Sequence, residues 1–193
     1  THTLSLHDAL PICMTKTLPR ISAILFVFYL LSAPAVALDT AAIDRVRNKG
    51  VLDEQQDYPV IDSFVEDALE EFINTQDFSN ISDLRTQIVI RSSSNRDSAQ
   101  AQYREQFFSS ARQYLSEALD AVSNIEDQKH RLRMLVNLLI LADNLQSWRL
   151  VEPVLGYTDH NNKLVRYWAV HAVTQPAIVQ QLNEGDMDSM ELA

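Results

Sequence analysis

The chain has 193 residues, of which 26 are acidic and 16 are basic, and its formal net charge is -10. This acidic balance argues against a nucleic-acid partner, because nucleic-acid binders need clustered lysine and arginine to displace counterions. The three glycines, Gly50, Gly156 and Gly185, cannot form a glycine-rich phosphate loop. No cysteine follows Cys13, so the rest of the chain forms no disulfide and depends on packing for its stability.

The first 37 residues predict an export signal that follows a foreign segment. Residues 1–13 resemble a translated sequencing adapter and are interpreted as an artefact, with a genuine N-terminal extension as the alternative. From Met14 the chain has a short basic start, an apolar run over residues 21–31 and the small residues that end at Ala37. This pattern is typical of a secretory signal peptide, here residues 14–37. We expect cleavage after Ala37, a periplasmic or extracellular location and no stable membrane insertion afterwards; retention as an anchor is the alternative.

The remaining sequence predicts helices only and has the length of a single domain. An N-terminal linker with a short helix is expected over residues 38–57, and one helical domain over residues 58–186. Residues 187–193 are interpreted as a tail, the start of a helix that the end of the sequence truncates. Within the domain, residues 59–75 carry apolar side chains at helical spacing opposite an acidic face, and Pro59 suits a first helical turn.

Two further helices flank a serine-rich loop. The first is expected over residues 81–91, with Ser79 or Ser82 as its cap, and it ends at the loop 92–95. The second is expected to be capped by Asp97 and to continue to residue 122. Its aromatic and aliphatic residues recur three or four positions apart, which indicates a buried stripe.

The C-terminal part predicts one central helix and three shorter ones. Residues 126–144 are apolar over most of the helix circumference near their C-terminal end, so this helix should be covered on several sides. Shorter helices are expected over residues 147–155, 161–174 and 176–183. Gly156 is placed like a C-terminal helix stop between the first two of these.

Residues 159–173 read Asp-His-Asn-Asn-Lys-Leu-Val-Arg-Tyr-Trp-Ala-Val-His-Ala-Val. The acidic turn, the Val-Arg pair and the alanines three apart resemble the second helix of a HEAT-like repeat, and the resemblance extends over about residues 126–184. It implies that Asp159 caps a helix or pairs with a neighbouring arginine, that Arg166 joins a ladder between repeats, and that the alanines let helices approach. We therefore expect an all-α fold of antiparallel helical hairpins, stacked as a short HEAT-like α-solenoid or an irregular helical bundle. Because a solenoid needs at least about three units, the earlier helices should contribute as divergent units or as a cap.

The residues that could perform chemistry are scattered. His130, His160 and His171 lack the spacing of a zinc-binding helix. The acidic cluster over residues 66–71 lacks the oxygen-rich loop of calcium sites and is interpreted as a solvated face. We therefore expect no catalytic residue, no cofactor and no metal.

Two hypotheses for function remain. The first is a non-catalytic exported helical-repeat protein, an interaction or scaffold module that binds a protein or peptide partner. Its interaction surface would be Arg166, Tyr167, Trp168 and His171, because tryptophan, tyrosine and arginine dominate binding hot spots; packing of the aromatic rings in the core is the alternative. The second is a small-ligand carrier or enzyme with a pocket between helices that uses His171, Glu152 or Arg166. A polar pocket in which these three groups converge would favour the second hypothesis.

Overall fold

The computed structural model describes residues 38–75 and 78–190, with side chains described as far as Glu184. These residues belong to one compact unit, residues 37–193. The adapter-like segment 1–13, the signal segment 14–37 and Cys13 lie outside the described residues. No helix in the described part of the chain is both long and apolar enough to cross a membrane.

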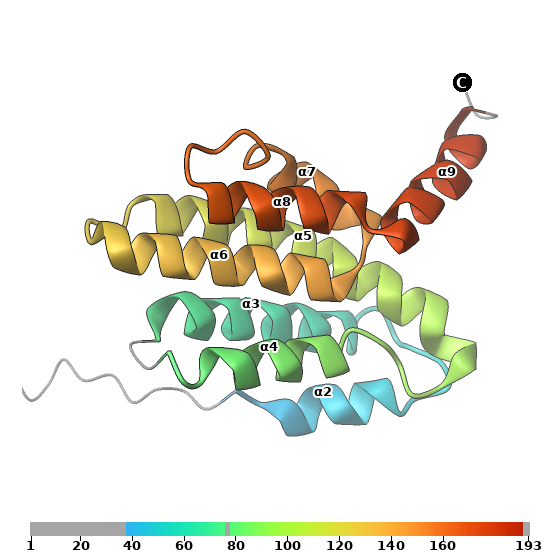
Figure 1. The fold of residues 1–193 in the computed structure, drawn as a ribbon. Helices are drawn as coiled ribbons and strands as arrows, with labels where there is room; N and C mark the ends of the chain where they lie inside the picture. Colours follow the sequence, from blue (N-terminus) through green and yellow to red (C-terminus); the bar gives the residue numbers. More distant parts are fainter. Residues whose placement is uncertain (1–37, 76–77, 191–193) are drawn as a thin grey trace, which may run out of the picture. The chain divides into compact units, whose positions relative to one another are not determined.

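All regular structure in the described residues is helical (Figure 1). Two short 3-10 turns, η2 and η3, precede the α-helices α5 and α7. In chain order the elements are α2 (Thr40–Arg47), α3 (Tyr58–Asn74), α4 (Ile81–Ile90), η2 (Asp97–Ala99), α5 (Gln100–Ser123), α6 (Gln128–Leu145), η3 (Trp148–Leu150), α7 (Val151–Leu155), α8 (Lys163–Thr174) and α9 (Pro176–Met190).

The helices stack as successive antiparallel hairpins. The pairs α3/α4, α5/α6 and α7/α8 form three layers, with α2 against α3 at one end and α9 leaving the stack after α8 (Figure 1). Helix α6 contacts α4, α5 and α8, so the central position expected for this helix, which is apolar over most of its circumference near its C-terminal end, is confirmed. The predicted all-α fold is also confirmed, and the earlier helices supply the two layers that precede α7/α8.

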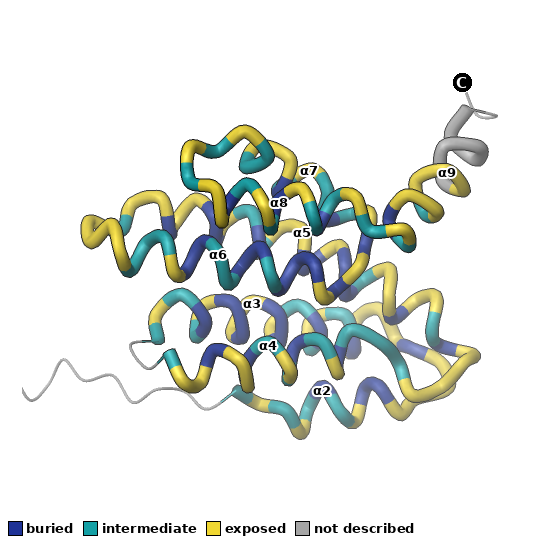
Figure 2. Tube along the Cα trace, viewed as in Figure 1, coloured by how far each residue is buried: buried dark blue, intermediate teal, exposed yellow. Residues whose placement is uncertain are grey.

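The core follows the apolar stripes of the sequence. The stripe on α5 is buried along its length, from Tyr103 at 0% exposed to Val122 at 1%. On α6, Leu138 and Leu139 are both 0% exposed. Figure 2 shows the buried faces of α3, α5 and α6 turned toward one another, with exposed residues on the outer sides. Helix packing of this kind places the hydrophobic surface between layers and leaves α8 on the outside of the last layer.

Several expected helix ends are wrong in detail. Asp97 does not cap α5, because it opens the turn η2 and Ala99 becomes the N-cap. The N-cap of α4 is Asn80, which makes no side-chain capping hydrogen bond. The last helix continues to Met190 rather than ending at Asn183.

A buried polar network that the sequence did not predict joins α2 to the end of α4. Arg47, only 8% exposed, donates to the backbone oxygens of Ser93 and Ile90. Both Arg47 and Arg91 form ion pairs with Asp44, at 3.1 and 2.8 Å. Burial opposes ionisation of Asp44, but the hydrogen bonds and charges of Arg91 and Arg47 together lower the pKa of this carboxyl. The network stabilises the fold rather than forming a ligand site, because its groups bind one another.

Candidate interaction surface

Helix α8 begins with a side-chain cap and is held by small buried residues. Asn162 Oδ1 accepts hydrogen bonds from the backbone N–H groups of Leu164 and Val165, at 2.9 and 3.4 Å. Such a cap satisfies N–H groups that have no partner within the helix. Ala169 is fully buried and Ala172 is 6% exposed, on the side of α8 that packs against α6. Small side chains at these positions bring the two helices close and fix which face of α8 points outward.

The outward face of α8 is apolar. Leu164 is 53% exposed, Tyr167 is 56% exposed and Val170 is 43% exposed. These residues are three positions apart, so they lie next to one another along the helix surface. We use the name α8 surface for Leu164, Tyr167, Trp168, Val170 and His171. In Figure 2 the outer side of α8 is largely exposed or intermediate in burial.

Three rings form a cluster on this surface. The ring of Tyr167 stacks on that of His171 with centroids 5.7 Å apart, and it meets Trp168 edge to face at 5.3 Å. Trp168 also contacts His171 edge to face at 5.7 Å, and it packs partly against the core. Mutual contacts of this type restrict the rotamers of all three rings. The cluster is therefore a largely fixed aromatic ridge, with Tyr167 as its most exposed member.

The side chain of His171 contacts Asp143 of α6. Its Nδ1 lies 2.7 Å from Oδ1 of Asp143, whose side chain is only 9% exposed. Gln175 Nε2 donates to the same oxygen at 2.8 Å. A buried carboxylate needs such partners, because its desolvation is otherwise unfavourable. The pair holds the imidazole against Tyr167 and couples the α8 surface to the core.

Arg166, which the sequence placed on the same surface, points elsewhere. Its Nη1 donates to the backbone oxygens of His160 and Asn161, at 2.7 and 3.2 Å. The resemblance implied that Asp159 caps a helix or pairs with a neighbouring arginine and that Arg166 joins a ladder between repeats. In the described residues the cap of α8 is Asn162, and neither Asp159 nor Arg166 forms an ion pair. Because carbonyls of the preceding loop occupy this guanidinium, Arg166 positions the start of α8 rather than adding a hot-spot cation.

The three groups proposed for an inter-helix pocket do not converge. His171 binds Asp143, Arg166 binds the loop before α8, and Glu152 pairs with Arg112 at 3.2 Å. Two hollows are described on the surface, one of about 370 Å³ and one of about 390 Å³, and neither is lined by any of these three residues. Neither of these two hollows therefore brings the three residues together.

The acidic face of α3 is solvated. Glu66, Asp67 and Glu70 are exposed, and Glu66 accepts a hydrogen bond from the Tyr114 hydroxyl at 3.2 Å. Among the side chains of residues 38–75 and 78–184 there is no group of three or more histidines, cysteines, aspartates or glutamates that could hold a metal.

Sequence reasoning identified the aromatic residues of the α8 surface but missed its supports. Leu164 and Val170 could have been found, because each lies three positions from Tyr167. Asp143 could also have been noticed, because it is the one carboxylate of α6 and lies in the apolar C-terminal part of that helix. No protein-family model, curated protein or solved structure matches the chain, so the geometry of this surface is the basis for any statement about function.

Proposed function

We propose that this chain is an exported, non-catalytic helical-repeat module that binds a protein or peptide partner through the α8 surface. The observation that carries the proposal is the apolar outer face of the last hairpin, where Leu164, Tyr167 and Val170 are 53%, 56% and 43% exposed. Within the part of the chain that the structure describes, no other element covers this face. An apolar face in that position is suited to a partner.

The α8 surface is favoured over the other exposed apolar residues because it is the larger contiguous group and because its rings contact one another. Val51, Ile90, Trp148 and Leu155 are exposed on separate segments, and Val179 and Leu182 form a pair on α9. On α8, Tyr167 is already stacked on His171, which Asp143 holds at 2.7 Å. A pre-ordered aromatic side chain loses less conformational entropy when it binds, which is how tyrosine and tryptophan act as hot spots.

The export part of the proposal rests on residues 14–37 and on the composition of the chain after them. A basic start, an apolar run and small residues before Leu38 support secretion through a cleaved signal. The expected result is an exported chain whose first residue is Leu38, as measured by N-terminal sequencing of the protein from the periplasm or medium. An uncleaved chain in the membrane or cytoplasm would contradict it.

Site-specific photocrosslinking tests the binding surface. A benzophenone amino acid is placed at Val170 and, as a control, at Asp67 on the solvated face of α3, and each protein is exposed to an extract of the source cell envelope. We expect a discrete protein adduct from position 170 and none from position 67. Adding Tyr167→Ser should remove the adduct, whereas Ile90→Ser, which removes an exposed apolar side chain on α4, should not.

No adduct at position 170, equal labelling from position 67, or an adduct that survives Tyr167→Ser would each contradict the proposal. Circular dichroism of the variants separates loss of binding from loss of folding. Since Tyr167 and Ile90 are both more than half exposed, both serine variants should remain folded.

A further inference from the structure

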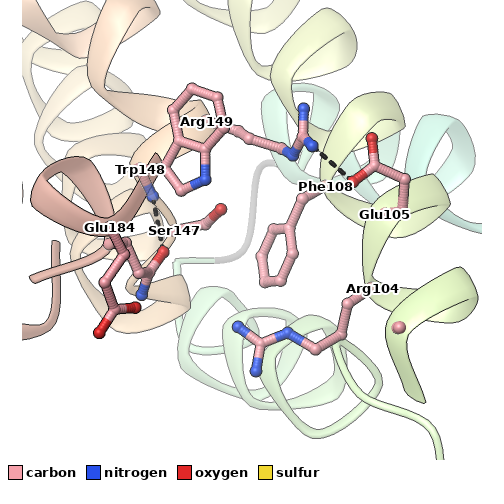
Figure 3. Close-up of a pocket in the computed structure, with 9 residues that line it drawn as sticks. Arg104, Glu105, Phe108, Ser147, Trp148, Arg149 and Glu184 are labelled. Atoms are coloured by element: carbon pink, nitrogen blue, oxygen red, sulfur yellow. Dashed lines mark hydrogen bonds and ion pairs between the residues drawn. The ribbon is translucent and has the colours of Figure 1, made fainter. Parts of the chain in front are cut away.

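A second surface feature lies away from the α8 surface, between α5, η3 and α9. It is a hollow of about 370 Å³, which is at the lower end of the range for small-ligand sites. Figure 3 shows its side chains, which come from three separate parts of the chain. They are Ala101, Arg104, Glu105 and Phe108 of α5, Ser147, Trp148 and Arg149 around η3, and Gln181 and Glu184 of α9. We call it the α5–α9 hollow.

Two aromatic rings supply its apolar surface. Phe108 is 4% exposed and presents its ring at the centre of the view in Figure 3, whereas Trp148 is 41% exposed. Because the Phe108 ring is almost fully buried, Trp148 supplies most of the exposed aromatic surface from which an apolar group of a ligand could displace water.

Two arginines lie on these rings, but only one has its charge compensated. The guanidinium carbon of Arg149 lies 4.9 Å from the Trp148 ring centroid, and its Nη2 pairs with Glu105 at 2.5 Å. The guanidinium carbon of Arg104 lies 5.5 Å from the Phe108 ring centroid. Within the part of the chain that the structure describes, Arg104 forms neither an ion pair nor a hydrogen bond through its side chain. Its N–H donors are therefore open to a ligand.

Two other polar side chains of the hollow, Gln181 and Glu184, already form hydrogen bonds. Gln181 accepts from the backbone N–H of Trp148 at 3.1 Å and donates to the backbone oxygen of Gln146 at 3.0 Å. Glu184 accepts from Gln180 Nε2 at 2.8 Å, and in Figure 3 its carboxylate points away from the Phe108 ring. Gln181 thus joins α9 to the turn. Among the described residues, Arg104 is the cation of the hollow that has no carboxylate partner, and Glu184, which is bonded to a neutral amide, is an unpaired anion turned away from the Phe108 ring.

We propose that the α5–α9 hollow binds a carboxylate that is attached to an apolar group, with the carboxylate on Arg104 and the apolar group against Phe108 and Trp148. A planar guanidinium can donate two parallel N–H···O hydrogen bonds to a carboxylate. Such charge-assisted hydrogen bonds are stronger than those between neutral groups. Two kinds of ligand carry a carboxylate attached to an apolar group: a free aliphatic acid, and the C-terminus of a peptide that ends in an apolar residue.

Titration of the full chain followed by NMR tests the site. The indole N–H signals of Trp148 and Trp168 report on the hollow and on the α8 surface, and the spectrum of Trp148→Phe assigns them. The probes are 4-methylpentanoate, its neutral amide, a tetrapeptide that ends in a leucine carboxylate, and the same peptide with a C-terminal amide. We expect the Trp148 signal to shift saturably with at least one of the two acids and with neither amide, while the Trp168 signal stays in place.

Substitutions on α5 make the test specific. Arg104→Gln should weaken binding of the acid about tenfold or more, because it removes the charge-assisted bonds. Arg112→Gln, on the same helix but paired with Glu152 outside the hollow, should bind as the unmodified chain does. Saturation with the free acid alone assigns a small-molecule ligand, and saturation with the peptide alone assigns a chain terminus. Absence of saturable shifts with both acids, equal binding of an amide, or unchanged affinity in Arg104→Gln would overturn the proposal.

Discussion

Tyr103→Phe removes one oxygen atom from the most buried polar contact of the core. Tyr103 is 0% exposed, and its hydroxyl donates to the backbone oxygen of Arg91 at 2.8 Å. Arg91 is the C-cap of α4 and also pairs with Asp44 on α2. Phenylalanine fills nearly the same volume, so the substitution tests the hydrogen bond rather than the packing.

The expected loss is about 1–3 kcal/mol in the free energy of unfolding, because a buried carbonyl loses its donor. The measurement is urea denaturation with linear extrapolation to water. Tyr114→Phe is the matched control on the same helix, since the Tyr114 hydroxyl makes an exposed contact with Glu66. Its effect should stay within about 0.5 kcal/mol. A Tyr103→Phe protein no less stable than the Tyr114→Phe protein would refute the reasoning.

The same tyrosine predicts an alkaline signature. Burial raises the pKa of Tyr103 above its ordinary value of 10.0 in the folded chain. Above about pH 10 the unfolded chain therefore binds fewer protons than the folded one, and the free energy of unfolding falls as pH rises. Tyr103→Phe removes this contribution, so the stability of the variant should fall less steeply above pH 10. Parallel pH profiles for the two proteins would contradict a buried phenol at this position.

Three other substitutions test separate parts of the fold. Asp44→Asn should destabilise the chain at pH 7, because the ionised carboxyl stabilises the fold through Arg91 and Arg47. In urea titrations the difference between the two proteins should begin to shrink below about pH 4 and vanish only below the lowered pKa that Asp44 has in the folded chain. Asn162→Ala removes the cap of α8 and should lower the free energy of unfolding by about 1 kcal/mol. Leu138→Ala in α6 should lower it by about 2–5 kcal/mol, whereas Leu155→Ala at an exposed position should have little effect.

The sequence predicted the buried faces of the helices better than the residues at which the helices begin and end. The stripe on α5 and the opposed faces of α3 repeat at 3.6-residue spacing, and a periodic pattern identifies a helix face without knowledge of its partner. The predicted start of α5 was wrong. Asp97 has a side chain that can cap a helix, but the chain forms a 3-10 turn there before α5 begins. A cap depends on the path of the preceding loop, which short sequence patterns specify poorly.

The candidate surface shows the same limit at longer range. His171 lies four positions after Tyr167 and three after Trp168, so the contact of each ring with His171 on one helix face could be predicted. Asp143 lies 28 positions from His171, and its pairing arises only when α8 packs on α6. The α5–α9 hollow likewise joins Arg104 to a turn and a helix that are distant in sequence. Contacts between layers are set by packing geometry, which a single sequence does not display.

The most direct test of the central claim is the dissociation constant of the partner identified by crosslinking. The constant is measured for the unmodified chain, for Tyr167→Ser and for the control Ile90→Ser. If Tyr167 is the most exposed anchor of the α8 surface, its loss should weaken binding about 30-fold or more, as expected for a hot-spot residue. Ile90→Ser should leave the constant unchanged. Equal dissociation constants for the unmodified chain and Tyr167→Ser would contradict the assignment of this surface as the binding site.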